Sequence, residues 1–166
     1  MRISVGKLMT SKRSLILTYD QGMEHGPSAF DLNTVDPNKI LDIALDGNYN
    51  GIVLHHGIAE KYYGAYYTHV PLIVKLNGKS SLARINPISR MVCSVEHAAK
   101  LGAAAVGYTI YDGSPAEPEM FSEFQRIVES AHDYGMPVIA WMYPRGPDVP
   151  DESKTDILAY SARLAL

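Results

Sequence analysis

The sequence predicts an α/β fold, a partial (β/α)8 TIM barrel with about five βα units present. Apolar runs of strand length alternate with amphipathic helical stretches along the 166 residues, an order typical of parallel strands joined by helical crossovers. Polar and aromatic side chains gather at the carboxyl ends of these runs. No linker interrupts the alternation, so residues 1–166 are expected to form a single domain, shorter than the roughly 250 residues of a complete barrel.

Five strands account for the apolar runs. They are expected at residues 14–20, 51–56, 71–77, 104–112 and 137–144. Because side chains alternate along a strand, each run has an apolar face and a face that becomes polar toward its carboxyl end. The polar faces carry, in chain order, Thr18 and Asp20, Lys75 and Asn77, Thr109 and Tyr111, and Trp141 and Tyr143.

Helix signals separate the predicted strands. Asp36 stands before a proline and Ser94 before an apolar stretch, and both are typical helix N-caps. The stretch 117–135 carries an apolar stripe at helical spacing and ends on glycine. A last helix is expected to begin near Ser153, with Asp156 three residues on in the manner of a capping box.

Two architectures fit this order of elements, a five-stranded doubly wound sheet and part of an eight-stranded barrel. In a barrel the carboxyl ends of the strands converge on one mouth, whereas in an open sheet they are spread along an edge. The polar residues at the strand ends, on one face in each case, favour the barrel. The sequence stops at Leu166 inside an apolar helical stripe, which leads us to expect a truncated barrel.

Composition limits the partners and the compartment. The chain is 46% hydrophobic and 20% charged with a net charge of -3, which gives no electrostatic basis for binding nucleic acid or an anionic membrane. No apolar run approaches the roughly 20 residues of a membrane span, and residues 1–14 lack the apolar core of a signal peptide. With a single cysteine, Cys93, an internal disulfide is excluded. We therefore expect a cytoplasmic protein.

Two motifs connect the sequence to a known family. The stretch "LTYDQGMEHGP" lies on the first predicted strand and "WMYPRGP" on the fifth. With both in this order, the sequence from about Ser14 onward resembles the archaeal-type class I fructose-bisphosphate aldolases of the DhnA family. The resemblance implies a Schiff-base-forming barrel, without metal or organic cofactor, that cleaves a phosphorylated sugar, fructose 1,6-bisphosphate, and forms homo-oligomers. It places the Schiff-base lysine on a sixth strand, beyond Leu166.

The resemblance assigns two catalytic residues. Asp20 would lie beside the reacting carbons of the substrate and stabilise the iminium, although a strand-terminal aspartate can also simply cap the following turn. Tyr143 matches the catalytic tyrosine of the family. Aldol cleavage needs a group that removes the proton of the C4 hydroxyl and later protonates the enamine carbon, and a phenol beside an iminium can do both. The alternative for Tyr143 is a core tyrosine.

Four further residues are candidates for substrate binding. Trp141 shares a strand face with Tyr143 and would pack under the substrate, unless it only fills the core. His25 would hydrogen-bond a hydroxyl or phosphate group, while the neighbouring Glu24 is expected to be solvated. Arg145 would meet a phosphate or lie on the surface. The fourth candidate is Lys75.

Lys75 has two interpretations. Alone among the lysines it lies within an apolar strand, where burial favours the neutral amine that attacks a carbonyl, so the residues alone nominate it as the Schiff-base lysine. The resemblance places that lysine elsewhere and leaves Lys75 as a polar interior residue that touches the substrate. Two other functions stay open: a related superfamily aldolase or thiolase acting on another phosphorylated sugar, and a non-catalytic truncated assembly module.

The sequence predicts no metal ligands. His55 and His56 are adjacent on the second predicted strand, so their side chains should point to opposite faces and cannot hold one ion together. Neither is expected to be a metal ligand.

Overall fold

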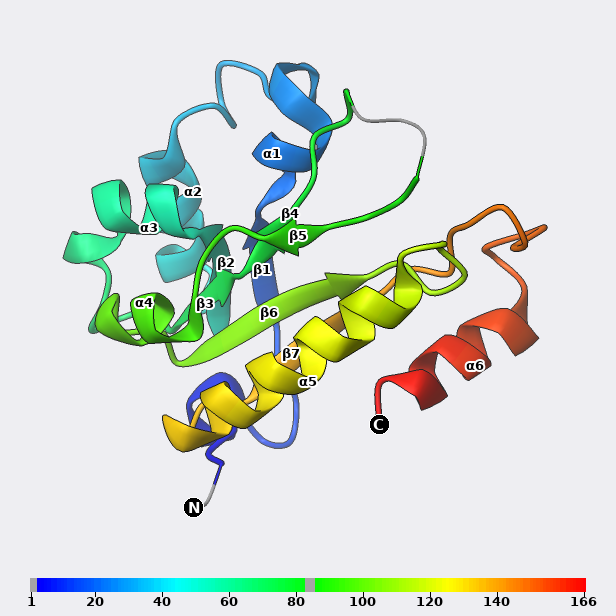
Figure 1. Ribbon diagram of the computed structural model, residues 1–166. Coiled ribbons are helices and arrows are strands. Elements are labelled where there is room, and N and C mark those ends of the chain that lie inside the picture. Colours follow the sequence, from blue (N-terminus) through cyan, green and yellow to red (C-terminus); the bar gives the residue numbers. More distant parts are fainter. Residues whose placement is uncertain (1–2, 83–85) are drawn as a thin grey trace.

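A parallel sheet forms the frame of the protein (Figure 1), a computed structural model in which residues 3–82 and 86–166 are described. Its strands are β1 (Ile16–Tyr19), β2 (Gly51–His55), β3 (Leu72–Lys75), β6 (Ala105–Ile110) and β7 (Val138–Met142). They are adjacent in the order β1-β2-β3-β6-β7, which is also their order in the chain. A doubly wound sheet needs a point at which the strand order reverses. The uninterrupted order therefore excludes that alternative and confirms the partial barrel.

Helices follow most of the strands. They are α1 (Gln21–His25), α2 (Pro37–Asp46), α3 (His56–Tyr62), α4 (Val95–Lys100), α5 (Glu117–Asp133) and α6 (Thr155–Leu164). Single 3-10 turns lie at Gly6–Leu8, Gly26–Ala29 and Tyr63–Ala65. Among residues 3–82 and 86–166, none of the helices combines the length and the hydrophobicity of a membrane span.

The two faces of the sheet are packed differently. On the outer face, buried side chains of α2, α3, α4 and α5 meet alternate strand residues such as Leu54 and Val74 in one large core. The intervening residues Val53, Ile73 and Ala105 form a smaller cluster on the inner face, together with Leu8 from the N-terminal turn. This alternation is the one that the sequence predicts, and it leaves the polar strand ends on the inner face.

Two of the three predicted helix starts are confirmed. The Asp36 carboxylate accepts a hydrogen bond from the backbone N–H of Asn38 at 3.0 Å, and the Ser94 hydroxyl accepts one from that of His97 at 3.1 Å. The predicted capping box at Ser153 is wrong. Helix α6 starts at Thr155, and the Ser153 hydroxyl donates to Asp151 Oδ1 at 2.6 Å instead, because a local turn precedes the helix.

The third predicted strand is divided in two. Strand β3 ends at Lys75, and the next residues form β4 (Asn77–Gly78), which pairs antiparallel with β5 (Arg90–Met91). The Asn77 amide donates to the carbonyl oxygens of Ser89 (3.1 Å) and Thr109 (2.7 Å) and accepts from the Thr109 backbone N–H (2.8 Å). Asn77 therefore does not line the polar cavity with Lys75. Its side chain links β4 to the end of β6 through these hydrogen bonds.

Replacing Asn77 with alanine should destabilise the fold. The side chain is fully buried, so Asn77→Ala leaves the three backbone groups that it pairs without partners or water. We expect a loss of about 3 kcal/mol or more in the free energy of unfolding, measured by urea denaturation. Asn33→Ala is the matched control because Asn33 is exposed, and it should change stability little. Equal stability of the two variants would contradict the role assigned to Asn77.

Candidate active site

A polar cavity of about 470 Å³ lies where the carboxyl ends of β1, β3, β6 and β7 meet on the inner face. Five of the six predicted site residues line it. Its lining consists of Thr18, Asp20, Gln21, Glu24, His25, Lys75, Thr109, Tyr111, Tyr143 and Arg145. Residues distant in sequence meet here because parallel strands bring their carboxyl ends to one edge.

The ammonium group of Lys75 is buried within this cavity. Its side chain is 3% exposed, and Nζ lies 3.0 Å from Asp20 Oδ2 and 3.8 Å from Glu24 Oε1. The ring centre of Trp141 is 5.1 Å from the same atom. Two carboxylates and an aromatic face all stabilise a positive charge. Nζ of Lys75 is thus already engaged by two carboxylates and an aromatic ring.

Glu24 corrects a sequence-based expectation. It was expected in solvent, but its side chain is only 18% exposed and its Oε2 accepts a hydrogen bond from the Tyr111 hydroxyl at 3.1 Å. The reason is α1, a short helix that follows Asp20 and directs residue 24 back toward Lys75. The four-residue spacing from Asp20 to Glu24 places two side chains on one helical face. That spacing was the signal available in the sequence.

Tyr143 stands beside Tyr111 and Arg145. The centres of the two phenol rings are 6.1 Å apart, and the Arg145 guanidinium carbon lies 5.9 Å from the ring centre of Tyr143. Burial, and then the negative charges of Asp20 and Glu24, raise the pKa of Tyr143. The phenol therefore holds its proton at neutral pH, although the residue is 43% exposed.

Arg145 and His25 lie at the edge of the cavity. The Arg145 guanidinium forms an ion pair with Glu152 at 2.8 Å, and both side chains are about half exposed. His25 is the last residue of α1 and is exposed. Both groups are positioned to meet an anionic substituent that extends out of the cavity.

Trp141 reaches the cavity through its contact with Lys75. Its ring also lies directly against the backbone of β6 at Gly107, where any Cβ atom would collide with the indole. Glycine at position 107 is thus required by the close approach of the tryptophan, and not by backbone conformation. The ring packs with the inner-face cluster that includes Val53 and Ile73.

The two adjacent histidines have different surroundings. His55 ends β2 and is half-buried, and burial, followed by the charge of Lys75, lowers its pKa, so the imidazole is neutral at pH 7. The sequence predicted that His56 continues the strand, but His56 is the first residue of α3. Both line a second, mainly apolar cavity of about 500 Å³, which also borders Asp20.

Cys93 is an ordinary buried thiol. It is 6% exposed, and burial raises its pKa to about 11, so it stays protonated at neutral pH. A protonated thiol is a poor nucleophile. Cys93 takes no part in the polar cavity.

Comparison with known proteins identifies the family. A model of the DeoC/LacD family aldolases matches residues 14–166, nearly the whole chain. The chain belongs to the DeoC/LacD aldolase family. The polar cavity of this aldolase-family chain occupies the mouth of its barrel, where enzymes of this architecture carry their active sites.

Curated relatives are fructose-bisphosphate aldolases of class 1. The protein of Thermoproteus tenax is 50% identical over 93% of this chain and 58% of its own length. That of Halobacterium salinarum is 44% identical over 92% of this chain and 59% of its own length. The chain thus spans less than two thirds of the curated relatives that it matches.

Solved aldolase structures share the fold of this aldolase-family chain. One is an archaeal fructose-1,6-bisphosphate aldolase whose catalytic lysine is covalently bound to the carbinolamine intermediate of the substrate. It matches with a TM-score of 0.88 and 46% identity over 98% of this chain and 63% of that one. A Schiff-base-forming aldolase studied through its reaction intermediates matches with a TM-score of 0.87 and 48% identity, over 92% of this chain and 60% of that one.

The contact between Gly107 and Trp141 gives a spectroscopic prediction. In Gly107→Ala the new methyl group must displace the indole, and because Trp141 is the single tryptophan of the chain, its fluorescence reports that movement. We expect the emission maximum to shift to longer wavelength as the ring becomes more hydrated. Gly57→Ala is the control, since a Cβ there meets no atom within 4 Å. Identical spectra for the two variants would show that the ring does not depend on the glycine.

Proposed function

We propose that this chain supplies the first five βα units of a class I fructose-bisphosphate aldolase. The complete enzyme would cleave fructose 1,6-bisphosphate reversibly to dihydroxyacetone phosphate and glyceraldehyde 3-phosphate, in the cytoplasm and as a homo-oligomer. The observation that carries the proposal is the convergence of Asp20, Lys75 and Tyr143 on one polar cavity at the mouth of the barrel. The 50% identity to an aldolase of Thermoproteus tenax supports it.

The Schiff-base lysine of the proposed enzyme would lie beyond Leu166, on the sixth strand. Its amine would add to the substrate ketone, and loss of water would give a cationic iminium that withdraws electrons from the C3–C4 bond. This assignment is supported by the surroundings of Lys75, whose Nζ is already paired with Asp20 at 3.0 Å and Glu24 at 3.8 Å. Lys75 then acts as a fixed positive charge beside the substrate.

Tyr143 would transfer the proton. Burial and the nearby carboxylates keep the phenol protonated before reaction. An iminium formed next to it adds a positive charge that favours the ionised form, and the phenol proton passes to solvent, to which Tyr143 is exposed. In that state Tyr143 can take the proton of the C4 hydroxyl as the C3–C4 bond breaks. It can then return a proton to the enamine carbon.

The remaining residues would bind and orient the sugar phosphate. Asp20 lies where a carboxylate can stabilise the iminium and fix a hydroxyl, since its oxygen already pairs with the Lys75 ammonium. Arg145 and His25 supply hydrogen-bond donors for a phosphate group at the edge of the cavity. Trp141 shapes the inner wall through its contact with Gly107.

A second candidate is the same chemistry on another phosphorylated sugar. The relative from Methanocaldococcus jannaschii, 34% identical over 91% of this chain, is described as a fructose-bisphosphate aldolase and 6-deoxy-5-ketofructose 1-phosphate synthase. Turnover of fructose 1,6-bisphosphate and of 6-deoxy-5-ketofructose 1-phosphate can be compared in a protein completed with the missing strands. The preferred substrate separates the two candidates.

The first test concerns the chain of 166 residues by itself. We expect no appreciable cleavage of fructose 1,6-bisphosphate and no adduct with dihydroxyacetone phosphate after borohydride reduction, because the amine that forms the intermediate is not Lys75. Cleavage that survives a chelator and is abolished in Lys75→Met would show instead that Lys75 is the nucleophile.

The second test uses a completed barrel, in which the sixth to eighth strands of a relative are appended. Tyr143→Phe removes only the phenol oxygen and should reduce kcat by about 100-fold or more, whereas borohydride trapping of the substrate should survive. Asp20→Asn should reduce both turnover and trapping, because the iminium loses its counter-charge. Normal turnover in both variants would refute the roles assigned to these residues.

A further inference from the structure

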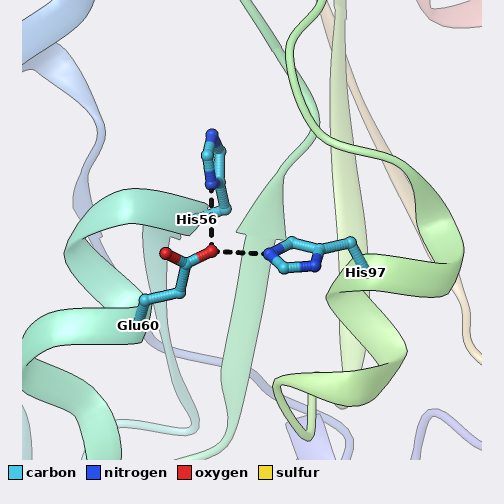
Figure 2. A group of neighbouring side chains, drawn as sticks. All are labelled: His56, Glu60 and His97. Atoms are coloured by element: carbon cyan, nitrogen blue, oxygen red, sulfur yellow. Dashed lines mark hydrogen bonds and ion pairs between the residues drawn. The ribbon is translucent and has the colours of Figure 1, made fainter.

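A second cluster of chemically active side chains lies outside the polar cavity. It consists of His56 and Glu60 on α3 and His97 on α4. His56 Nδ1 is 3.3 Å and His97 Nε2 is 2.6 Å from the same carboxylate oxygen, Glu60 Oε1. Figure 2 shows the two imidazoles approaching this oxygen from different directions. No role in the proposed aldolase reaction accounts for this convergence.

Local structure fixes the three side chains in this arrangement. His56 and Glu60 are four residues apart on α3, so they share one face of the helix. The backbone N–H of His97 is held by the N-cap hydroxyl of Ser94, which sets the position of the third side chain on α4. The two rings are nearly perpendicular, at 80°, with centres 5.7 Å apart.

The distances are close to those of a metal site. Zinc binds imidazole nitrogen and carboxylate oxygen at about 2.0–2.2 Å, so neighbouring ligand atoms around a tetrahedral ion are separated by roughly 3.3 Å. The His56–Glu60 separation of 3.3 Å already matches this value. The His97–Glu60 separation of 2.6 Å must widen modestly, and the His97 side chain is 44% exposed and thus has room to move.

We propose that His56, Glu60 and His97 form a binding site for a divalent transition-metal ion of the zinc class, with one coordination position left to water. Two neutral imidazoles and one carboxylate carry a net negative charge and are the ligand types that zinc prefers. The ion would connect α3, which follows β2, to α4, which lies between β5 and β6 in the chain. This proposal is independent of the proposed aldolase function.

The alternative is a simple hydrogen-bonded link in which both imidazoles donate to Glu60. That link accounts for the distances, but it gives no affinity for an added ion beyond that of other exposed side chains. Metal binding therefore distinguishes the two.

The test is titration of the purified protein, free of any histidine tag, with Zn²⁺ against a chromogenic indicator. We expect one equivalent per chain to bind, and His97→Ala and Glu60→Ala to weaken binding by about tenfold or more. His69→Ala is the matched control, because His69 is an exposed histidine outside the cluster, and it should bind Zn²⁺ as the unaltered protein does. Circular dichroism establishes that each variant is folded.

Two further measurements complete the test. Zn²⁺ should raise the thermal unfolding midpoint of the unaltered protein and of His69→Ala, but not that of His97→Ala, because the ion links two helices only when all ligands are present. Excess Mg²⁺ should not displace Zn²⁺, since magnesium prefers oxygen ligands. Equal binding by all the proteins, absence of binding, or displacement by Mg²⁺ would overturn the proposal.

Discussion

The buried charge of Lys75 is the constraint on which the arrangement of the mouth depends. An ammonium group taken out of water needs opposite charge close by, and the strand that carries it offers none. The compensation comes from the segment after β1, which supplies Asp20 at the strand end and Glu24 in α1. This need explains why the apolar first strand runs directly into a short helix that carries acidic and polar residues.

Local patterns in the sequence were sufficient to predict the strand faces and two of the helix starts. Alternation along the strands correctly assigned Thr18, Lys75 and Trp141 to the inner face, because every strand of a barrel has one face toward the helices and one away from them. The caps at Asp36 and Ser94 were also recognisable, since a cap is satisfied within four residues of its own helix.

Features that depend on distant partners could not be predicted in this way. The division of the third strand results from the Asn77 amide pairing with Thr109, 32 residues away. The spacing of Glu24 from Asp20 is local, but its hydrogen-bond partner Tyr111 lies 87 residues further along the chain. His56 was assigned by strand alternation, although β2 ends one residue earlier and a helix then decides its direction. For Asn77 and Glu24 a tertiary contact overrides a reasonable local expectation, and for His56 the start of a helix does so.

Asp20 borders a second cavity besides the polar one. It lines both that cavity, of about 470 Å³, and the mainly apolar cavity of about 500 Å³ beside it. Truncation of this side chain to alanine would therefore remove volume from the boundary of two compartments at once, and water or ligand atoms could pass between them. Asparagine keeps the shape of the boundary and removes only its charge. A kinetic defect in an alanine variant would thus combine the effect of an opening between the cavities with the effect of the lost charge. The asparagine variant reports the effect of the lost charge alone.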